Sequence, residues 1–179
     1  MPEVDLKIGE LRDCVRGATG GAIVALIIVA AVAGAGLPTM VASVLGLVTL
    51  FANGLANAAW RYVRARSLAK MIAGIDATNG HDHAWYMRLA GRGAFSAFTA
   101  FLLCGLVPLI ANLLAPTDLG VPIVATASIL LAIGAVKSHC LTAAWWRPEL
   151  QPMLLGTSAA ALAYATAHTM RLVLDMPPS

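Results

Sequence analysis

The sequence contains few charged residues. Only 12% of its 179 residues are Asp, Glu, Lys or Arg, whereas 59% are hydrophobic and the mean hydropathy is +0.79. A soluble globular domain is typically about 25% charged and about 45–50% apolar. The chain therefore lacks the polar surface that a water-soluble fold of this length needs. Since lipid tails can face apolar side chains directly, the composition predicts a membrane protein.

Several motifs that mark enzymes and binding modules are also missing. The three cysteines, Cys14, Cys104 and Cys140, form no C-x-x-C pair, so neither a zinc site nor a disulfide framework is indicated. The sequence has no Walker loop, no G-x-S-x-G and no H-E-x-x-H, and we expect neither an enzyme nor a tightly bound cofactor. The basic segment 61–92 carries no aromatic ladder, so no nucleic acid partner is expected.

Long uncharged runs dominate the rest of the chain. A membrane-spanning helix needs about 20 mostly apolar residues. Five runs without Asp, Glu, Lys or Arg approach or reach this length: residues 17–36, 40–60, 93–116, 121–136 and 154–170. We predict a single all-α domain over residues 1–179, an integral membrane protein of five transmembrane helices. Pro38 suits a tight turn between the first two spans.

The basic residues predict the orientation. With five spans, segments 1–16, 61–92 and 137–153 lie on one side, and they hold every Lys and Arg except Arg171. Lys and Arg favour the cytoplasmic side, which places the N-terminus and the loop 61–92 in the cytoplasm. The membrane would be the plasma membrane, or the inner membrane if the source is bacterial. Trp145, Trp146 and Arg147 are typical of an interfacial anchor.

The first run allows one alternative. Residues 1–36 resemble a signal peptide, with a basic start, an apolar run and Ala31-Val32-Ala33 as a possible cleavage site. The run is long and a second span follows at once, so we expect it to stay as a transmembrane helix.

Five segments share their order and spacing with the helices of one membrane family. Residues 11–36 read LRDCVRGATGGAIVALIIVAAVAGAG, and residues 46–64 read GLVTLFANGLANAAWRYVR. Residues 95–108 read FSAFTAFLLCGLVP, followed by GAVKS at 134–138 and GTSAAALAY at 156–164. In this order and at this spacing, the segments resemble the five helices of the vacuolar iron transporter family.

The resemblance implies a fold and a function. Members of that family have five helices and a cytoplasmic N-terminus, in agreement with the charge pattern. They typically export iron or manganese from the cytosol in exchange for protons, as dimers with the ion path near the dimer interface. We therefore expect transport of an iron or manganese ion by a chain in the lipid bilayer, as a homodimer or paired with a homologue.

The chain departs from the family at the positions expected to carry transport. The family's first helix has an Asp just before the glycine that aligns with Gly21, and here that position is Gly20. Its second helix commonly has an acid where this chain has Asn53, a Met near Asn57 and a Glu at Arg61. The resemblance thus places the transport path at Gly20, Asn53, Asn57 and Arg61. None of these supplies the carboxylate oxygens that divalent cations favour.

The remaining polar groups offer little replacement. None of the nine acids lies in the five runs, and Arg61 would repel a cation at the cytoplasmic mouth. Asn53 and Asn57 are four residues apart and share a helix face. They either line a path or hydrogen-bond between helices. Both interpretations predict that they face protein rather than lipid.

A second metal hypothesis lies in the loop GIDATNGHDHAW. Asp76, His81, Asp82 and His83 are residue types that bind zinc, manganese or iron(II). Their spacing fits no established motif, and a solvated loop explains them equally well. His168 in the fifth run could relay protons or simply pack against neighbours.

Three functions remain open at this point. The first is divalent metal transport. The second is a non-transporting structural or regulatory relative that has lost the metal path. The third is transport of an uncharged or anionic solute, which Arg61 alone supports. Small residues four apart, namely Gly21 with Ala25, Ala30 with Gly34 and Ala52 with Ala56, predict close helix packing.

Overall fold

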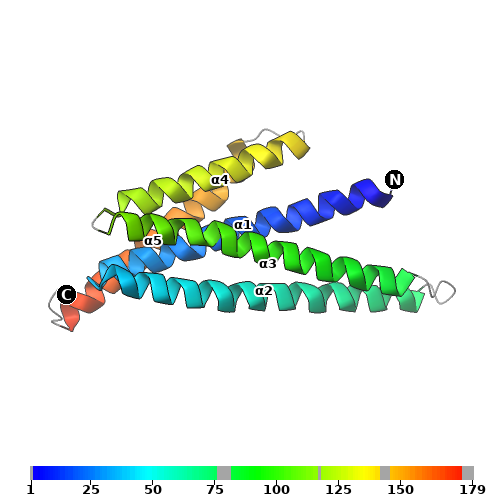
Figure 1. The fold of residues 1–179 in the computed structure, drawn as a ribbon, viewed down its shortest axis with the longest axis horizontal. Helices are drawn as coiled ribbons and strands as arrows, with labels where there is room; N and C mark the ends of the chain where they lie inside the picture. Colours follow the sequence, from blue (N-terminus) through cyan, green and yellow to red (C-terminus); the bar gives the residue numbers. More distant parts are fainter. Residues whose placement is uncertain (1, 76–81, 117, 142–145, 175–179) are drawn as a thin grey trace.

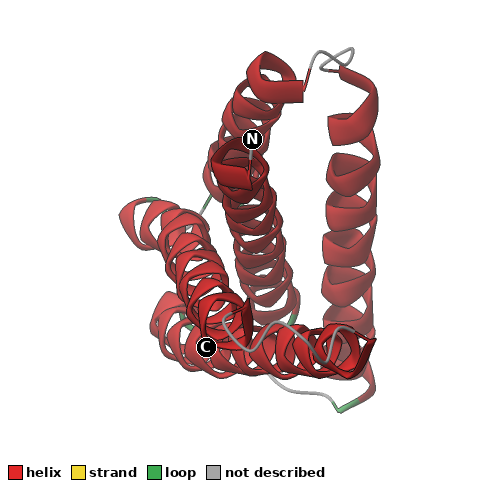
Figure 2. Cartoon of the chain, turned by 90° about the vertical axis from the view of Figure 1, so that its right-hand side faces the viewer, coloured by secondary structure: helices red, strands yellow, loops and turns green. Residues whose placement is uncertain are grey.

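The computed structural model describes residues 2–75, 82–116, 118–141 and 146–174, with side chains described for 11–67, 91–116, 118–136 and 154–174. Within these ranges the chain is all-α, as predicted. Its helices are α1 (Pro2–Gly34), α2 (Thr39–Ile75), α3 (Asp82–Leu114), α4 (Gly120–Leu141) and α5 (Trp146–Val173). Viewed from the end that holds the N-terminus, the described chain is helical except at its connections (Figure 2).

The helices extend beyond the uncharged runs. The segment 61–92, expected as a loop, instead continues α2 as far as Ile75 and starts α3 at Asp82. Residues 61–75 read RYVRARSLAKMIAGI, and their Ala, Arg, Leu, Lys and Met are strong helix formers. The C-terminal end of α2 and the N-terminal end of α3 lie at the same end of the molecule as the N-terminus (Figure 1).

Three helices in the described part of the chain are long and apolar enough to cross a membrane. They are the stretches Leu11–Gly34, Thr39–Ser67 and Gly91–Leu114. Gly120–Val136 is a shorter apolar stretch of α4. The first of these stretches starts earlier than residue 17, and it therefore includes Asp13.

Helix α1 lies at the centre of the bundle. It contacts each of the other four helices, and its most extensive packing is against α3. Ala25 and Val29 of α1, Leu50 of α2, and Phe101 and Leu109 of α3 form the main core. A smaller cluster joins α1 to α5 through Leu26, Ala30 and Ala160. These contacts make α1, α2 and α3 one packed unit.

Glycines on α1 allow this packing. A Cβ at Gly17 would overlap the backbone carbonyl of Ala97, and one at Gly21 would overlap that of Phe101. A Cβ at Gly34 would overlap the carbonyl of Tyr164 on α5. The small residues thus bring helix backbones into contact, as predicted for Gly21 and Gly34.

The α1–α2 turn follows a standard helix ending. Gly36 has a φ of 68°, in the left-handed region that glycine tolerates best. Its N–H donates to the Ala33 carbonyl at 3.0 Å, and the N–H of Leu37 donates to the Val32 carbonyl at 3.1 Å. This is the Schellman arrangement of a helix C-terminus. Pro38 then precedes α2, in agreement with the predicted turn.

Helix α2 leaves a broad apolar face uncovered in the single chain. Met40, Val48, Leu55 and Trp60 are 76%, 62%, 65% and 67% exposed. A face this apolar is typical of a helix that contacts lipid or a partner. The small pair Ala52 and Ala56 lies exposed on the same helix.

Candidate transport site between helices α1, α2 and α3

A cavity of about 230 Å³ opens between α1, α2 and α3. Glycines at positions 17, 20 and 54 leave the space, because each lacks a side chain to fill it. A Cβ at Gly20 would lie 3.4 Å from the Phe101 ring, and one at Gly54 would lie 3.0 Å from the Phe98 ring. The full lining is Arg16, Gly17, Gly20, Gly54, Asn57, Ala58, Arg61, Ala97, Phe98 and Phe101.

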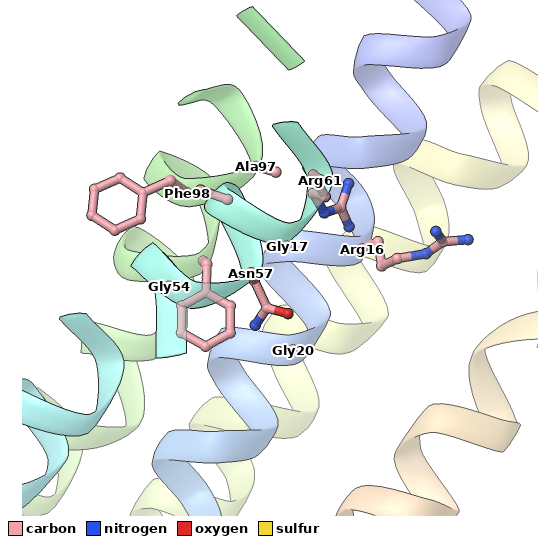
Figure 3. Close-up of a pocket in the computed structure, with 10 residues that line it drawn as sticks. Arg16, Gly17, Gly20, Gly54, Asn57, Arg61, Ala97 and Phe98 are labelled. Atoms are coloured by element: carbon pink, nitrogen blue, oxygen red, sulfur yellow. The ribbon is translucent and has the colours of Figure 1, made fainter. Parts of the chain in front are cut away.

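The cavity brings together three of the four residues predicted for the transport path. Gly20 comes from α1, and Asn57 and Arg61 come from α2. The Asn57 side chain extends from α2 toward Gly20, while the guanidinium of Arg16 points away from it (Figure 3). Asn57 and Arg61 are four residues apart, so they lie one turn apart on one face.

Arg61 is held by an acid from α1. Its Nη1 donates to Oδ1 of Asp13 at 2.6 Å. The two side chains are 21% and 35% exposed, so the pair is more shielded than a surface ion pair. A short charge-assisted hydrogen bond of this kind is stronger than a neutral one.

This pair changes the electrostatic expectation for Arg61. The sequence predicted that Arg61 would repel a cation at the cytoplasmic mouth. In the structure the Asp13 carboxylate balances that charge, so Arg61 no longer supports an anionic substrate. Asp13 is also the one carboxylate in the apolar stretches of α1 to α4, which are Leu11–Gly34, Thr39–Ser67, Gly91–Leu114 and Gly120–Val136.

Asn53 is placed differently from Asn57. It is exposed on α2 and does not line the cavity. Asn57 is exposed as well, although it borders the cavity. That both face protein therefore stays a prediction that would require a partner on α2.

The second metal hypothesis falls on residues whose side chains lie outside those described. Asp76 and His81 lie outside the described residues. Asp82 and His83 belong to the first turn of α3, but their side chains lie outside those described. Among the described residues, no group of three or more His, Cys, Asp or Glu side chains could hold a metal ion. His168 is exposed on α5 and stacks on Tyr164, with ring centroids 6.0 Å apart.

The sequence interpretation missed Asp13 and the aromatic wall of the cavity. Asp13 lies 48 residues before Arg61, and no local pattern links them. One sequence feature could have indicated such a partner: an arginine at the edge of an apolar run is favoured by an opposite charge nearby. Phe98 and Phe101 carried no signal, because their spacing is equally typical of a helix core.

Comparison with known families supports the resemblance. A family model described as the VIT family matches residues 71–168, more than half of the 179 residues. The chain belongs to the VIT (vacuolar iron transporter) family. A search of curated proteins gives no match.

Membership in the VIT family and the apolar helices together indicate an integral membrane protein with a metal-transporter-like function. The matched residues begin within α2, after the α1 and α2 residues that line the cavity, and they include the α3 lining residues Ala97, Phe98 and Phe101. The family assignment therefore does not by itself transfer a role to Gly20, Asn53, Asn57 or Arg61.

Proposed function

We propose that this chain is a divalent-metal transporter of the VIT family whose substrate is iron(II) or manganese(II). In this proposal α1 to α5 all cross the membrane, and the N-terminus is cytoplasmic. The observation that carries it is the α1–α2–α3 cavity, which is lined by Asn57 and by Arg61, the partner of Asp13.

The chemistry of the cavity suggests how a cation would enter. Asp13 offers carboxylate oxygens and Asn57 an amide oxygen, and divalent cations favour oxygen ligands of this kind. Arg61 serves as a tethered cation that occupies Asp13 while no metal is bound. The entering ion displaces the guanidinium, so the half-buried carboxylate keeps a positive partner throughout. Without a positive partner, this partly shielded carboxylate would lower the stability of the fold.

A second copy would complete the path. The exposed face of α2 carries Ala52 and Ala56, whose small side chains allow a close helix–helix approach. Pairing two chains along this face would place Asn53 and Asn57 of both copies between them. Four amide oxygens would then extend the site beyond the single cavity.

Metal uptake into proteoliposomes under a pH gradient tests the proposal. We expect the purified chain to accumulate manganese(II), and Asp13→Asn and Asn57→Ala to reduce uptake about tenfold or more, since even outer-shell partners of a metal are typically worth that much. Arg64→Gln is the matched control, because Arg64 is exposed on α2 and does not line the cavity.

Two further variants sharpen this test. Loss of uptake in Asn53→Ala would place the uncovered face of α2 in the path. Uptake that Asp13→Asn leaves unchanged would exclude the cavity as the route of the metal. Labelling of a cysteine at Ser67 from outside intact cells would contradict the proposed orientation.

The Asp13–Arg61 pair also favours a second candidate function. Because Arg61 occupies the one carboxylate of the described apolar stretches, the chain could be a non-transporting relative with a regulatory role. This candidate predicts no uptake by the chain alone under any gradient. It also predicts that Arg61→Gln, although less stable, still folds and gains no manganese(II) affinity.

A further inference from the structure

A second cavity lies at the opposite end of the bundle. It has a volume of about 320 Å³ and is lined from the end of α1, the start of α2, the end of α3 and α5. Figure 1 shows where these ends of α1, α2 and α3 lie. The polar lining of the cavity comes from Thr39 of α2, Asn112 of α3 and Tyr164 of α5. The rest of the lining is apolar and includes Gly36 at the α1–α2 turn.

Asn112 is the unusual member of this lining. It is only 6% exposed, and its amide has no hydrogen-bond partner among the described side chains and backbone groups. A buried amide left without a partner is unfavourable, and most such groups in proteins are satisfied by protein, water or ligand. An amide that lines a cavity in this state indicates that the cavity has a polar occupant.

The surrounding groups favour an occupant with negative charge. Helix α2, of 37 residues, starts at Thr39 and has no acidic residue in its first turn. The N–H groups of Thr39 and Met40 have no carbonyl partner within the helix, and the positive end of the helix dipole lies there. Such a helix start is a ready anion site.

Arg171 adds a full positive charge beside the same opening. A Cβ at Gly36 would lie 2.9 Å from Cζ of Arg171, so the guanidinium lies directly against a lining residue. The neighbouring acid, Asp118, is engaged elsewhere, because its Oδ1 accepts the N–H of Gly120 at 2.8 Å and caps α4. His168 stacks on the ring of the lining residue Tyr164.

We propose that this cavity binds a phosphate group through the N-terminus of α2, the Asn112 amide and the Arg171 guanidinium. The phosphate belongs either to a lipid headgroup or to a free anion. Both offer the same oxyanion, and the cavity lies where the apolar stretches of α1, α2 and α3 end, at Gly34, Thr39 and Leu114.

The test uses the full chain in detergent micelles. Inorganic phosphate is titrated calorimetrically, and retention of phosphatidylglycerol is followed by native mass spectrometry. Asn112→Leu removes the amide at similar volume, and Arg171→Gln removes the charge. Arg64→Gln is the control, since it removes an exposed arginine outside this cavity.

We expect Asn112→Leu and Arg171→Gln each to weaken binding about tenfold or more, as for one hydrogen bond to a charged group, and Arg64→Gln to leave it unchanged. Loss confined to phosphatidylglycerol identifies a lipid headgroup, and loss for inorganic phosphate identifies a free anion. The proposal is overturned if neither ligand binds, or if both variants bind like the unmodified chain. If Asn112→Leu does not fold, the binding measured for Arg171→Gln, a substitution near the end of α5, tests the proposal by itself. Metal uptake plays no part in this test, so it stands apart from the proposed function.

Discussion

Glycine at position 21 lets α1 and α3 touch backbone to backbone. The site for a Cβ there coincides with the carbonyl oxygen of Phe101, which belongs to a rigid helix and cannot move aside as a side chain would. Gly17 repeats the contact one turn earlier, against Ala97. The cavity between α1, α2 and α3 depends on this approach, because Gly20 lies on the neighbouring face of the same turn.

Gly21→Ala should therefore destabilise the chain. An extra methyl group in a packed interface typically lowers the free energy of unfolding by about 1–3 kcal/mol. We expect a lower unfolding temperature in detergent, measured by circular dichroism. The control is Gly91→Ala, where nothing lies within 4 Å of the added Cβ. Alanine there should leave stability unchanged or raise it by up to about 1 kcal/mol, since Gly is the weaker helix former. Equal effects of the two substitutions would refute the close-contact explanation.

In the described part of the chain, the Asp13–Arg61 ion pair joins α1 to α2 in the half of the bundle that faces the cytoplasm in the proposed orientation. Apart from this pair, their contact includes Leu50 of α2 in the shared core with Ala25 and Val29. An ion pair on a partly shielded surface holds two helices in register only if both charges stay paired, because either one alone would be poorly solvated.

A double-mutant cycle on Asp13 and Arg61 measures this coupling. Asp13→Asn and Arg61→Gln should each lower the free energy of unfolding. The loss of unfolding free energy in the double variant should be smaller than the sum of the two single losses. The difference, which is the coupling energy, is typically about 0.5–3 kcal/mol for residues in contact. We expect the lower part of that range, since the side chains are 21% and 35% exposed. The cycle of Asp13→Asn with Arg64→Gln should be additive, and additivity in both cycles would show that the pair contributes nothing.

The whole molecule leaves α2 poorly covered. α1 packs against four helices, whereas the apolar side chains Met40, Val48, Leu55 and Trp60 of α2 lie open in the single chain. Lipid tails can cover such an apolar face, and no partner protein is then needed. The adjacent small residues Ala52 and Ala56 favour a second helix instead.

Cysteine crosslinking distinguishes lipid from a second copy on α2. In a background without Cys14, Cys104 and Cys140, Ala56→Cys should give a crosslinked dimer when oxidised in liposomes. Ala22→Cys, at a position that is 0% exposed inside the bundle, should not crosslink. Monomer in both samples, with Ala52→Cys also unlinked, would leave lipid as the cover of this face.

The local features of the chain could be predicted from residue order. Uncharged runs predicted the helices, because a long apolar segment can satisfy its backbone in lipid only by internal hydrogen bonds. The turn at Pro38 was likewise local, since Gly36 and Pro38 act on their own backbone. The helix ends were less predictable: α2 continues to Ile75 because good helix formers follow its apolar part.

The site was predictable only in part. The resemblance pointed to Gly20, Asn57 and Arg61, and the fold brings them into one cavity. It pointed equally to Asn53, which the single chain leaves exposed outside that cavity.

The sequence alone determined that this chain is helical and largely apolar, because composition and short-range spacing decide those properties. Only the tertiary structure decided that Arg61 is neutralised by Asp13, since the two residues are 48 positions apart and meet through the packing of α1 against α2. The same holds for Asn112, which has no hydrogen-bond partner among the described residues and is buried because four helices meet at one end of the bundle. Charge balance and burial are properties of neighbours in space, and residue order does not state which neighbours those will be.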